Sequence, residues 1–400
     1  MKKKNRPRIL CAVCAVALLV MAVCPTAAVA EEPETPQTLS ATDVQEMQQT
    51  DAAVTALTDS DAYAGMDAGA RQTAALEQLD ALEQQGLVAK GSVYVDPDSG
   101  MISFSYPCGV LGGILLADPD DEDESLTGPD LADAETALQA LTEENGAVGK
   151  ATIYYAFDDG VNSSRYPYYA YMRDYWTSAG LDTTLDRMVT VSDLKKMADN
   201  DLCILSSHGA YYTYQYGWLW KRQATEPILL LLEQADFWND LCYGMDLLNH
   251  RIIKVNGAYA ITGDFFRAAY RGNRLKNTMV LSETCEFYGR SGHVNSSMAD
   301  GLLAGGAKAV MGYVNNVYAV YSRSVLWATV NRMIEGETLD EAVRYAKDVY
   351  GEDDIVWYTN QQTGRRPHAM ASYPVLSGDS NARLTQPGTV QDRMLQSDAA

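Results

Sequence analysis

Beyond its N-terminal third, the chain alternates between short apolar runs and longer segments of helical periodicity, which limits the folds open to it. Apolar, β-branched and aromatic residues form the runs at 152–157, 202–205, 279–281 and 309–311. Such runs, separated by helical segments, are typical of a mostly parallel sheet with helices on both faces. We therefore predict an α/β domain over residues 150–385.

The segments between these runs carry helix signals. Aromatic and apolar residues at 168–179 fall on one helical face, and Gly180 ends that helix. A later pair of helices is divided by Gly336, after which Thr338 and Glu341 have the spacing of a capping box.

Further elements are expected between residues 189 and 272. Residues 189–191 predict a short strand, followed by a helix that Ser192 caps. Residues 210–250 are rich in aromatic side chains, and we expect them to form a long insertion. A helix is predicted to begin near Thr262 and to stop near Gly272.

The N-terminus has the pattern of an export signal. Five basic residues precede an apolar run at 9–23, and a small-x-small cleavage pattern follows at 28–30. We predict a signal peptide at 1–30 and a secreted protein without stable membrane insertion, because the run is short for a bilayer span. A retained anchor is one alternative. Lipid attachment at Cys24 is another, less favoured because Val23 is bulkier than the residue that usually precedes a lipidated cysteine.

The chain is acidic, with a formal net charge of −22. Removal of the signal takes away five basic residues and no acidic ones, which makes the charge −27. Such a charge disfavours nucleic acid as a partner and attracts cationic substrates. The remaining cysteines, Cys108, Cys203, Cys242 and Cys285, are too few for a disulfide-stapled scaffold. Cys203 lies inside an apolar run, so its side chain should face the core.

Residues 31–149 are expected to form a pro-region or accessory segment. Few large apolar residues occur at 31–90, which predicts partly helical and loosely packed structure, and a β-hairpin is predicted around the turn at 96–100. The acidic run at 118–124 is typical of a solvated linker, and a short helix is expected at 130–143. No cofactor is expected. Calcium at the acidic run is the alternative, although the ligand spacing of a calcium loop is absent.

Two of the predicted strands end next to reactive side chains. His208 follows the run at 202–205, and Cys285 follows the run at 279–281. The carboxyl ends of parallel strands meet at one edge of a sheet, so we expect the imidazole and the thiol to lie together. A free thiol, with a pKa near 8.5, needs a base to become a good nucleophile at neutral pH. We predict that Cys285 is a nucleophile and His208 its general base.

Gly209 follows the histidine directly and lets the backbone approach a substrate. Its N–H and that of Cys285 are the candidates for an oxyanion hole. The other histidines, His250, His293 and His368, lack a strand-end glycine beside them. Taken singly, a histidine or a cysteine is more often structural than catalytic; the pairing at two strand ends favours catalysis.

Three segments, in this order, carry a resemblance to a known clan of peptidases: LCILSSHGA at 202–210, MVLSETCEFYG at 279–289 and GLLAGGAKAVMGYVNNV at 301–317. They resemble the clan that contains caspases, legumain, clostripain, gingipain and the CHAT domains. Those proteins share a strand ending in His-Gly, a later strand followed by x-x-Cys, then a helix, a small-residue turn and a strand. PVLSGDSNARL at 374–384 is similar to the closing strand of gingipain-like domains. The resemblance covers roughly 150–385 and implies a caspase-like fold and cysteine peptidase activity, often without a third catalytic residue.

The resemblance also implies a specificity. Legumain, clostripain and their relatives carry an acidic residue two positions before the nucleophile, in the primary specificity pocket, and Glu283 stands there. A carboxylate in that pocket favours Lys or Arg before the scissile bond, with Asp158 and Asp159 as further candidates for the pocket wall. The alternative is that Glu283 pairs internally, for example with Arg290 or Lys308.

Many relatives are made as zymogens, which implies self-processing after a basic residue. Arg71, Lys90 and Lys150 are the basic positions in segments that we expect to be weakly structured. The aromatic residues at 211–218 either line a peptide groove or pack over the sheet edge.

The predicted function is therefore that of a monomeric, secreted cysteine endopeptidase that cleaves peptides or proteins after basic residues. One alternative is a catalytically silent caspase-like binding domain. Another is a sortase-type transpeptidase, whose signature is partly matched at 281–285 but whose β-barrel requires strands where helices are predicted. The 25 tyrosines also fit an adhesive surface protein, without a repeat to support it. Residues 386–400 are expected to form a flexible tail.

Overall fold

The structure is a computed structural model that describes residues 38–97, 100–116, 148–157, 166–216, 221–360 and 369–384. The chain divides into two compact units, 1–38 and 39–400, and the architecture below is that of the second. Several predictions lie outside the described residues: the signal peptide, the acidic run, the helix at 130–143, Asp158, Asp159 and the tail. In the described part of the chain, no helix is long and apolar enough to cross a membrane.

Six strands form one sheet in the order β15-β14-β11-β6-β4-β5. Their bounds are β4 Gly149–Ala156, β5 Leu181–Asp186, β6 Leu202–Ser207, β11 Met279–Ser282, β14 Ala309–Tyr313 and β15 Pro374–Gly378. Neighbouring strands run parallel, except that β15 is antiparallel to β14. The four predicted strands and the α/β class are confirmed.

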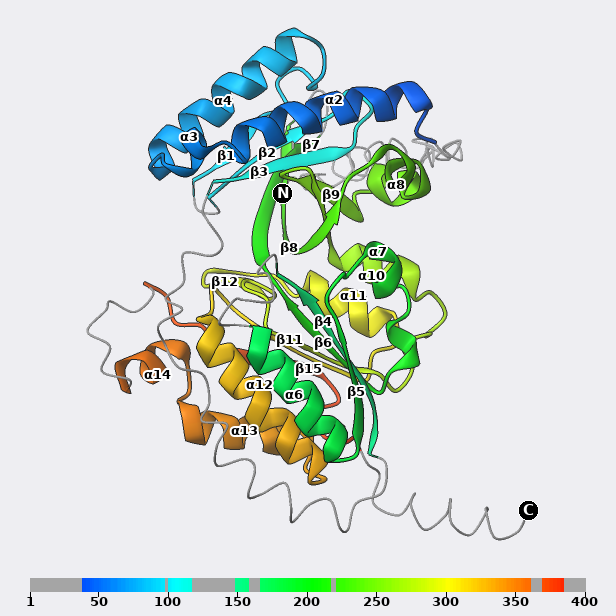
Figure 1. Cartoon of the computed structure of the whole chain (residues 1–400), viewed down its shortest axis with the longest axis vertical. Coiled ribbons are helices and arrows are strands. Elements are labelled where there is room, and N and C mark those ends of the chain that lie inside the picture. Colours follow the sequence, from blue (N-terminus) through cyan, green and yellow to red (C-terminus); the bar gives the residue numbers. More distant parts are fainter. Residues whose placement is uncertain are drawn as a thin grey trace, which may run out of the picture. The chain divides into compact units, whose positions relative to one another are not determined.

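Helices cover both faces of this sheet (Figure 1). Successive side chains of a strand point to opposite faces, so Ile204 joins a core with α6, α12 and α13, whereas Cys203 and Leu205 join a core with α7, α10 and α11. The bounds are α6 Tyr166–Ser178, α7 Val191–Leu194, α10 Gly263–Ala269, α11 Ser297–Ala304, α12 Ala319–Ile334 and α13 Leu339–Tyr350. The buried position of Cys203 and the capping box of Thr338 with Glu341 are confirmed.

The predicted strand at 189–191 is wrong. Thr190, not Ser192, is the N-cap of α7: its hydroxyl accepts from the Asp193 N–H at 3.2 Å, and the Asp193 carboxylate accepts from the Thr190 N–H at 3.1 Å. This capping box outweighs the β-branched composition of the segment. The strand of this region is β5, an edge strand in which Leu181 and Thr183 are buried while the alternating polar residues Asp182 and Thr184 are exposed.

A second sheet has the order β1-β2-β3-β9-β10-β8-β7. Its strands are β1 Tyr94–Asp96, β2 Met101–Ser105, β3 Leu111–Leu115, β7 Gly209–Tyr216, β8 Arg222–Gln234, β9 Ile252–Val255 and β10 Ala258–Ile261. The predicted hairpin is β1–β2, and the predicted insertion at 210–250 is largely strand. β3 lies before the predicted boundary at 149/150, and β9 lies after it. Because these two strands pair in parallel, one sheet contains strands from both sides of that boundary.

The N-terminal helices are α2 Ala41–Thr58, α3 Asp61–Ala64 and α4 Ala68–Gln84. The prediction of loose packing here is wrong, since Val44, Met47 and Leu79 are fully buried in the core that also contains α10 and α11. The few apolar residues of this region fall on the inner faces of their helices, so a low apolar content still builds a core.

A buried ion pair network ties α2 to the second sheet. The ammonium of Lys254, on β9, lies 2.5 Å from a carboxylate oxygen of Asp51 and 2.7 Å from one of Asp240. The hydroxyls of Tyr106 and Tyr259 donate to Asp51 and Asp240, respectively. The side chains of Lys254 and Asp240 are fully buried, so these charges depend on one another for solvation.

The remaining elements are short. They are the 3₁₀ helix η1 Met197–Asp199, the helices α8 Phe237–Cys242, α9 Gly244–Leu248 and α14 Asp354–Asn360, and the strands β12 Gly289–Arg290 and β13 His293–Val294.

Candidate active site

His208 and Cys285 lie beyond the carboxyl ends of two adjacent strands. β6 ends at Ser207 and β11 ends at Ser282, and the two strands pair in parallel with Leu205 beside Ser282. The chain order reverses at β4, which has β5 on one side and β6 on the other. Sites in open α/β sheets form beyond the carboxyl ends of the strands near such a switch point.

The backbone of Gly209 touches the Cys285 segment. A Cβ atom built on Gly209 would lie 2.2 Å from the carbonyl oxygen of Cys285 and 2.2 Å from Cγ2 of Thr284. Carbon atoms do not approach neighbours this closely, so only glycine fits without displacement. The His-Gly and Thr-Cys segments, far apart in the sequence, are therefore side by side.

One small cavity brings the predicted residues together. Its volume is about 20 Å³, which is room for about one water molecule. His208, Glu283 and Cys285 all line it. The other lining residues are Phe157, Tyr169, Ser207, Val317, Ala319 and Ser322.

The sulfur of Cys285 is covered by the loop between β14 and α12. The Val317 N–H donates to Sγ with a nitrogen–sulfur distance of 3.3 Å, and the Val317 carbonyl oxygen lies 3.7 Å from the same sulfur. An N–H donor favours the thiolate over the thiol. Glu286, directly after the cysteine, has a φ of +55°, and its N–H donates to the Asn315 carbonyl at 2.8 Å. Left-handed backbone at a non-glycine residue requires such support.

Contacts from β6, from β8 and from Phe157 fix the position of His208. Its carbonyl accepts from the Leu230 N–H of β8 at 2.9 Å and from the Ser207 hydroxyl at 3.1 Å. Its ring stands edge-on to Phe157, which follows β4, with the ring centroids 4.6 Å apart and the planes at 90°. The backbone contacts hold the main chain, and the aromatic contact restricts the plane of the imidazole.

Glu283 is buried at the cavity and hydrogen-bonded to neutral groups. One of its oxygens accepts from the Tyr169 hydroxyl at 2.8 Å and from the Ser206 hydroxyl at 2.7 Å. Burial, and then the negative charge of Glu283, raise the pKa of Tyr169 well above its ordinary value, so the phenol stays protonated as a donor. Arg290, which with Lys308 was an example of an internal partner for Glu283, pairs with Glu286.

The aromatic residues after His208 do not line this cavity. Those at 211–216 belong to β7, where Tyr211 and Tyr212 are buried. The Tyr212 hydroxyl donates to the Gly112 carbonyl at 2.8 Å, and that of Tyr211 donates to the His293 carbonyl at 2.9 Å. Residues 211–216 are therefore part of a strand of the second sheet, which neither alternative included, and 217–218 lie outside the described residues.

Two of the three predicted processing positions lie in regular structure. Arg71 is inside α4, where its guanidinium donates to the carbonyls of Tyr63 and Ala64, and Lys150 is inside β4. The expectation that these segments are weakly structured is wrong, because both have regular hydrogen bonds that a peptidase has to break. Lys90 lies exposed in the turn between α4 and β1.

No group of metal-ligating side chains is present within the residues that the structure describes, and the acidic run considered for calcium is not among them. Comparison with known proteins gives no assignment. No protein-family model matches the chain, and no curated protein matches it in sequence.

Sequence reasoning missed three residues that contact the side chains of Glu283 and Cys285. Val317 was not recognised because a backbone N–H has no signature in the side chain. Tyr169 and Ser206, whose hydroxyls donate to the Glu283 carboxylate, were not singled out from the sequence. The presence of a glutamate at 283 was the one available signal, since a buried carboxylate needs donors nearby.

Proposed function

We propose that this protein is a cysteine peptidase of caspase-like fold, with Cys285 as nucleophile and His208 as general base. The observation that carries the proposal is the contact of Gly209 with the Cys285 carbonyl, together with the cavity that His208 and Cys285 share. The shared cavity beyond the ends of adjacent parallel strands supports the proposal, because nucleophilic catalysis needs an imidazole near the thiol.

The chemistry follows from these groups. His208 takes the proton of the Cys285 thiol, and the thiolate attacks the carbonyl carbon of the scissile peptide. The N–H groups of Gly209 and Cys285 are assigned to the oxyanion. His208 then gives its proton to the departing amine, which leaves a thioester on Cys285. Water, deprotonated by His208, hydrolyses the thioester and restores the thiol.

The proposed specificity is for Arg or Lys before the scissile bond. Glu283 supports it, because a buried carboxylate at the cavity can form a charge-assisted pair with a cationic side chain. The net charge of −22 also favours the approach of cationic substrates. Asp158 and Asp159 remain candidates for the same pocket wall.

Substrate entry requires the cavity to widen. A volume of about 20 Å³ admits a water molecule but no arginine side chain. The loop that carries Val317 covers the sulfur, so we assign the opening movement to this loop. Secretion through the segment 1–30 belongs to the same proposal.

The test is cleavage of peptides that differ only in the residue before the scissile bond. We expect the purified full chain to cleave after Arg or Lys, and Cys285→Ala and His208→Ala to abolish cleavage. Cys242→Ala and His293→Ala, which alter an exposed cysteine and an exposed histidine away from the cavity, are the matched controls. Equal turnover by Cys285→Ala would overturn the proposal. Equal turnover by Glu283→Gln would remove only the specificity.

A catalytically silent domain of the same fold is the second candidate. The small volume of the cavity favours it, because a binding relic has no need to admit a substrate. It predicts no cleavage and no selective labelling of Cys285 by a thiol-directed probe. The sortase-type alternative is not favoured, since Cys285 follows a strand of a parallel sheet with helices on both faces.

A further inference from the structure

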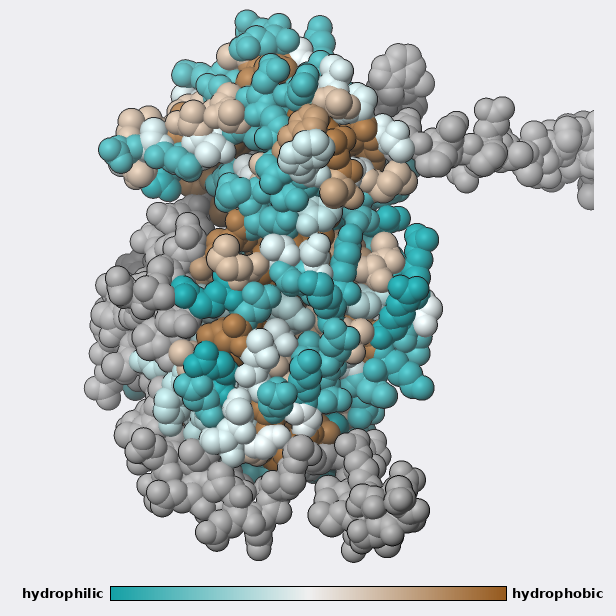
Figure 2. All heavy atoms as spheres, turned by 45° about the vertical axis from the view of Figure 1, so that its right-hand side comes forward, coloured by the Kyte–Doolittle hydropathy of each residue, from teal (hydrophilic) through white to brown (hydrophobic). Residues whose placement is uncertain are grey.

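A basic pocket lies away from the candidate active site, on the surface of α7, α9 and α10. Two adjoining cavities, of about 280 and 330 Å³, share Arg251, Ala268 and Arg271 in their walls. Hydrophilic side chains predominate over much of the middle of the molecule in Figure 2, where the side of Figure 1 that carries α7 and α10 comes forward. The cavities approach the size that small ligands occupy.

The charges around the pocket do not cancel. Four cationic side chains line the two cavities, Lys195, Arg251, Arg267 and Arg271, against the two carboxylates Asp246 and Asp264. The excess of two positive charges occurs in a chain whose net charge is −22. A local excess of this sign is the feature that an anionic ligand recognises.

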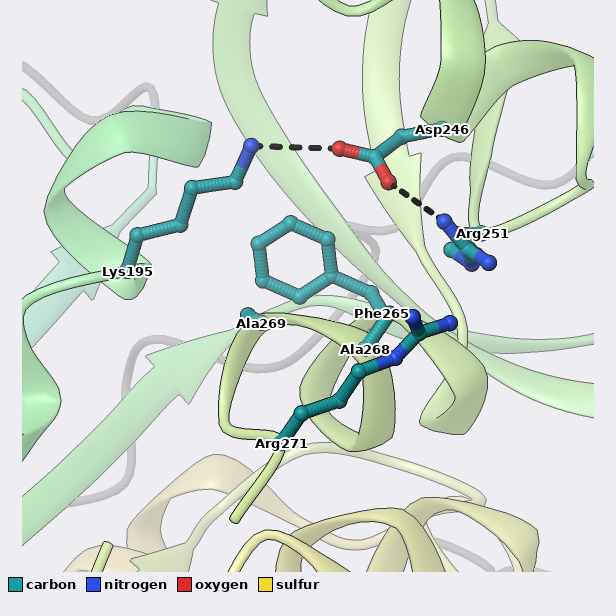
Figure 3. A pocket seen from close by; sticks show the side chains of 7 residues that line it. All are labelled: Lys195, Asp246, Arg251, Phe265, Ala268, Ala269 and Arg271. Atoms are coloured by element: carbon teal, nitrogen blue, oxygen red, sulfur yellow. Dashed lines mark hydrogen bonds and ion pairs between the residues drawn. The ribbon is translucent and has the colours of Figure 1, made fainter. Parts of the chain in front are cut away.

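One carboxylate fixes two of the cations. Asp246 accepts from the Lys195 ammonium at 3.1 Å and from the Arg251 guanidinium at 3.2 Å, as Figure 3 shows. The Phe265 ring lies beside them, with the Lys195 nitrogen 5.7 Å from its centroid. These contacts hold the cationic groups in place before any ligand arrives, which lowers the entropic cost of ligand binding.

Arg271 is the residue that points to a ligand. Within the described part of the chain it makes no hydrogen bond and no ion pair, although it lines both cavities. Figure 3 shows its guanidinium reaching toward the side of the pocket where that of Arg251 lies. Arg271 is exposed, and an anion held between its guanidinium and that of Arg251 would offset the repulsion between the two cations. The ion pairs around the pocket do not include Arg271, so they do not explain its presence there.

We propose that this pocket binds a multiply charged phosphate-bearing anion, with Arg251 and Arg271 as the principal contacts. Guanidinium groups match the geometry of phosphate oxygens and bind them in a bidentate manner. Two adjoining cavities with three guanidinium groups fit two phosphoryl groups better than one. This inference is independent of the proposed peptidase activity.

The experiment is a titration of the full chain with inorganic pyrophosphate. Calorimetry measures binding, and the midpoint of thermal unfolding measures the stabilisation that binding causes. Sodium chloride at matched ionic strength, inorganic phosphate and citrate are the comparison ligands. We expect pyrophosphate to bind more tightly than phosphate and to raise the midpoint, whereas chloride does neither. Citrate binding as tight as that of pyrophosphate would contradict the phosphate assignment. A pyrophosphate response no larger than that of chloride would overturn the site.

Two substitutions with opposite expected signs make the test specific. Arg271→Gln should weaken pyrophosphate binding about tenfold, since a charge-assisted contact is lost. Arg274→Gln is the matched control, because this exposed arginine of the same segment lines neither cavity. Asp264→Asn should tighten binding severalfold, because it releases the exposed Arg267, now 2.7 Å from that carboxylate. Equal losses in Arg271→Gln and Arg274→Gln would refute the assignment.

Discussion

Gly209 and Cys285 are in direct backbone contact: the space for a side chain on the glycine is occupied by the carbonyl oxygen of the cysteine. The contact lies just beyond the ends of β6 and β11, next to the positions of His208 and Cys285. A glycine in this position therefore does two things at once, since it closes the packing between the strands and sets the spacing of the proposed dyad.

The first prediction concerns this contact. Gly209→Ala should lower the free energy of unfolding by about 1–3 kcal/mol, because the added methyl group forces two backbone segments apart. Urea denaturation measures the change. Gly65→Ala is the control: a Cβ there meets nothing closer than 3.5 Å, so its effect should stay within about 0.5 kcal/mol. If the two variants are equally stable, the close approach is not present in solution.

The second prediction concerns the buried network of Lys254. Lys254→Met should destabilise the fold by about 3–5 kcal/mol, because it leaves the buried carboxylates of Asp51 and Asp240 without a cation. Arg344→Gln removes an exposed ion pair, with Asp340, and should cost less than about 1 kcal/mol. A loss for Lys254→Met as small as that of Arg344→Gln would show that the network is solvated.

The third prediction concerns processing. A cut after Lys90 should leave the helices α2 to α4 attached, because Asp51 is held by Lys254 and the apolar residues of α2 are buried. A protease that cleaves after lysine, followed by size-exclusion chromatography without denaturant, tests this. Co-elution of the two fragments is the expected result. Their separation would mean that the N-terminal segment is a releasable pro-region.

The fourth prediction concerns pH. Burial, assisted by the negative charge of Asp264, raises the pKa of Glu226 from its ordinary value of 4.5 to about 7. The folded state therefore binds more protons than the unfolded state between these values, and this residue makes stability fall as the pH rises through that window. The free energy of unfolding of Glu226→Gln, relative to that of the parent protein, should therefore rise by about 2–3 kcal/mol between pH 4 and pH 8.

Urea unfolding at a series of pH values measures this gain. Glu77→Gln, on the exposed side of α4, is the control and should follow the parent protein throughout. A constant difference between Glu226→Gln and the parent protein would contradict the assigned cause.

The parallel sheet could be predicted from the sequence because each of its central strands is a short apolar run that is buried on both faces. The run at 202–205 and the run at 279–281 show no polar alternation, and both became strands. β5 was missed because an edge strand exposes every second residue, and its polar residues concealed it. The placement of His208 and Cys285 at one edge followed from the parallel order.

The second sheet could not be predicted because its partners are distant in sequence. β3 and β9 pair in parallel although the acidic run, the first strands of the other sheet and His208 all lie between them. No local pattern records such a pairing. For the same reason, the partner of Lys254 on α2 and the N–H of Val317 above the sulfur were accessible only from the fold.

The central claim is that His208 activates Cys285. The most direct measurement is the rate at which iodoacetamide alkylates each cysteine of the native full chain, followed peptide by peptide in mass spectrometry between pH 5 and pH 9. The exposed Cys242 serves as the internal reference. We predict that Cys285 reacts faster than Cys242 near pH 6, where an ordinary thiol is almost fully protonated, and that His208→Ala removes this advantage. A pH profile of Cys285 that coincides with that of Cys242, and that His208→Ala leaves unchanged, would contradict the account.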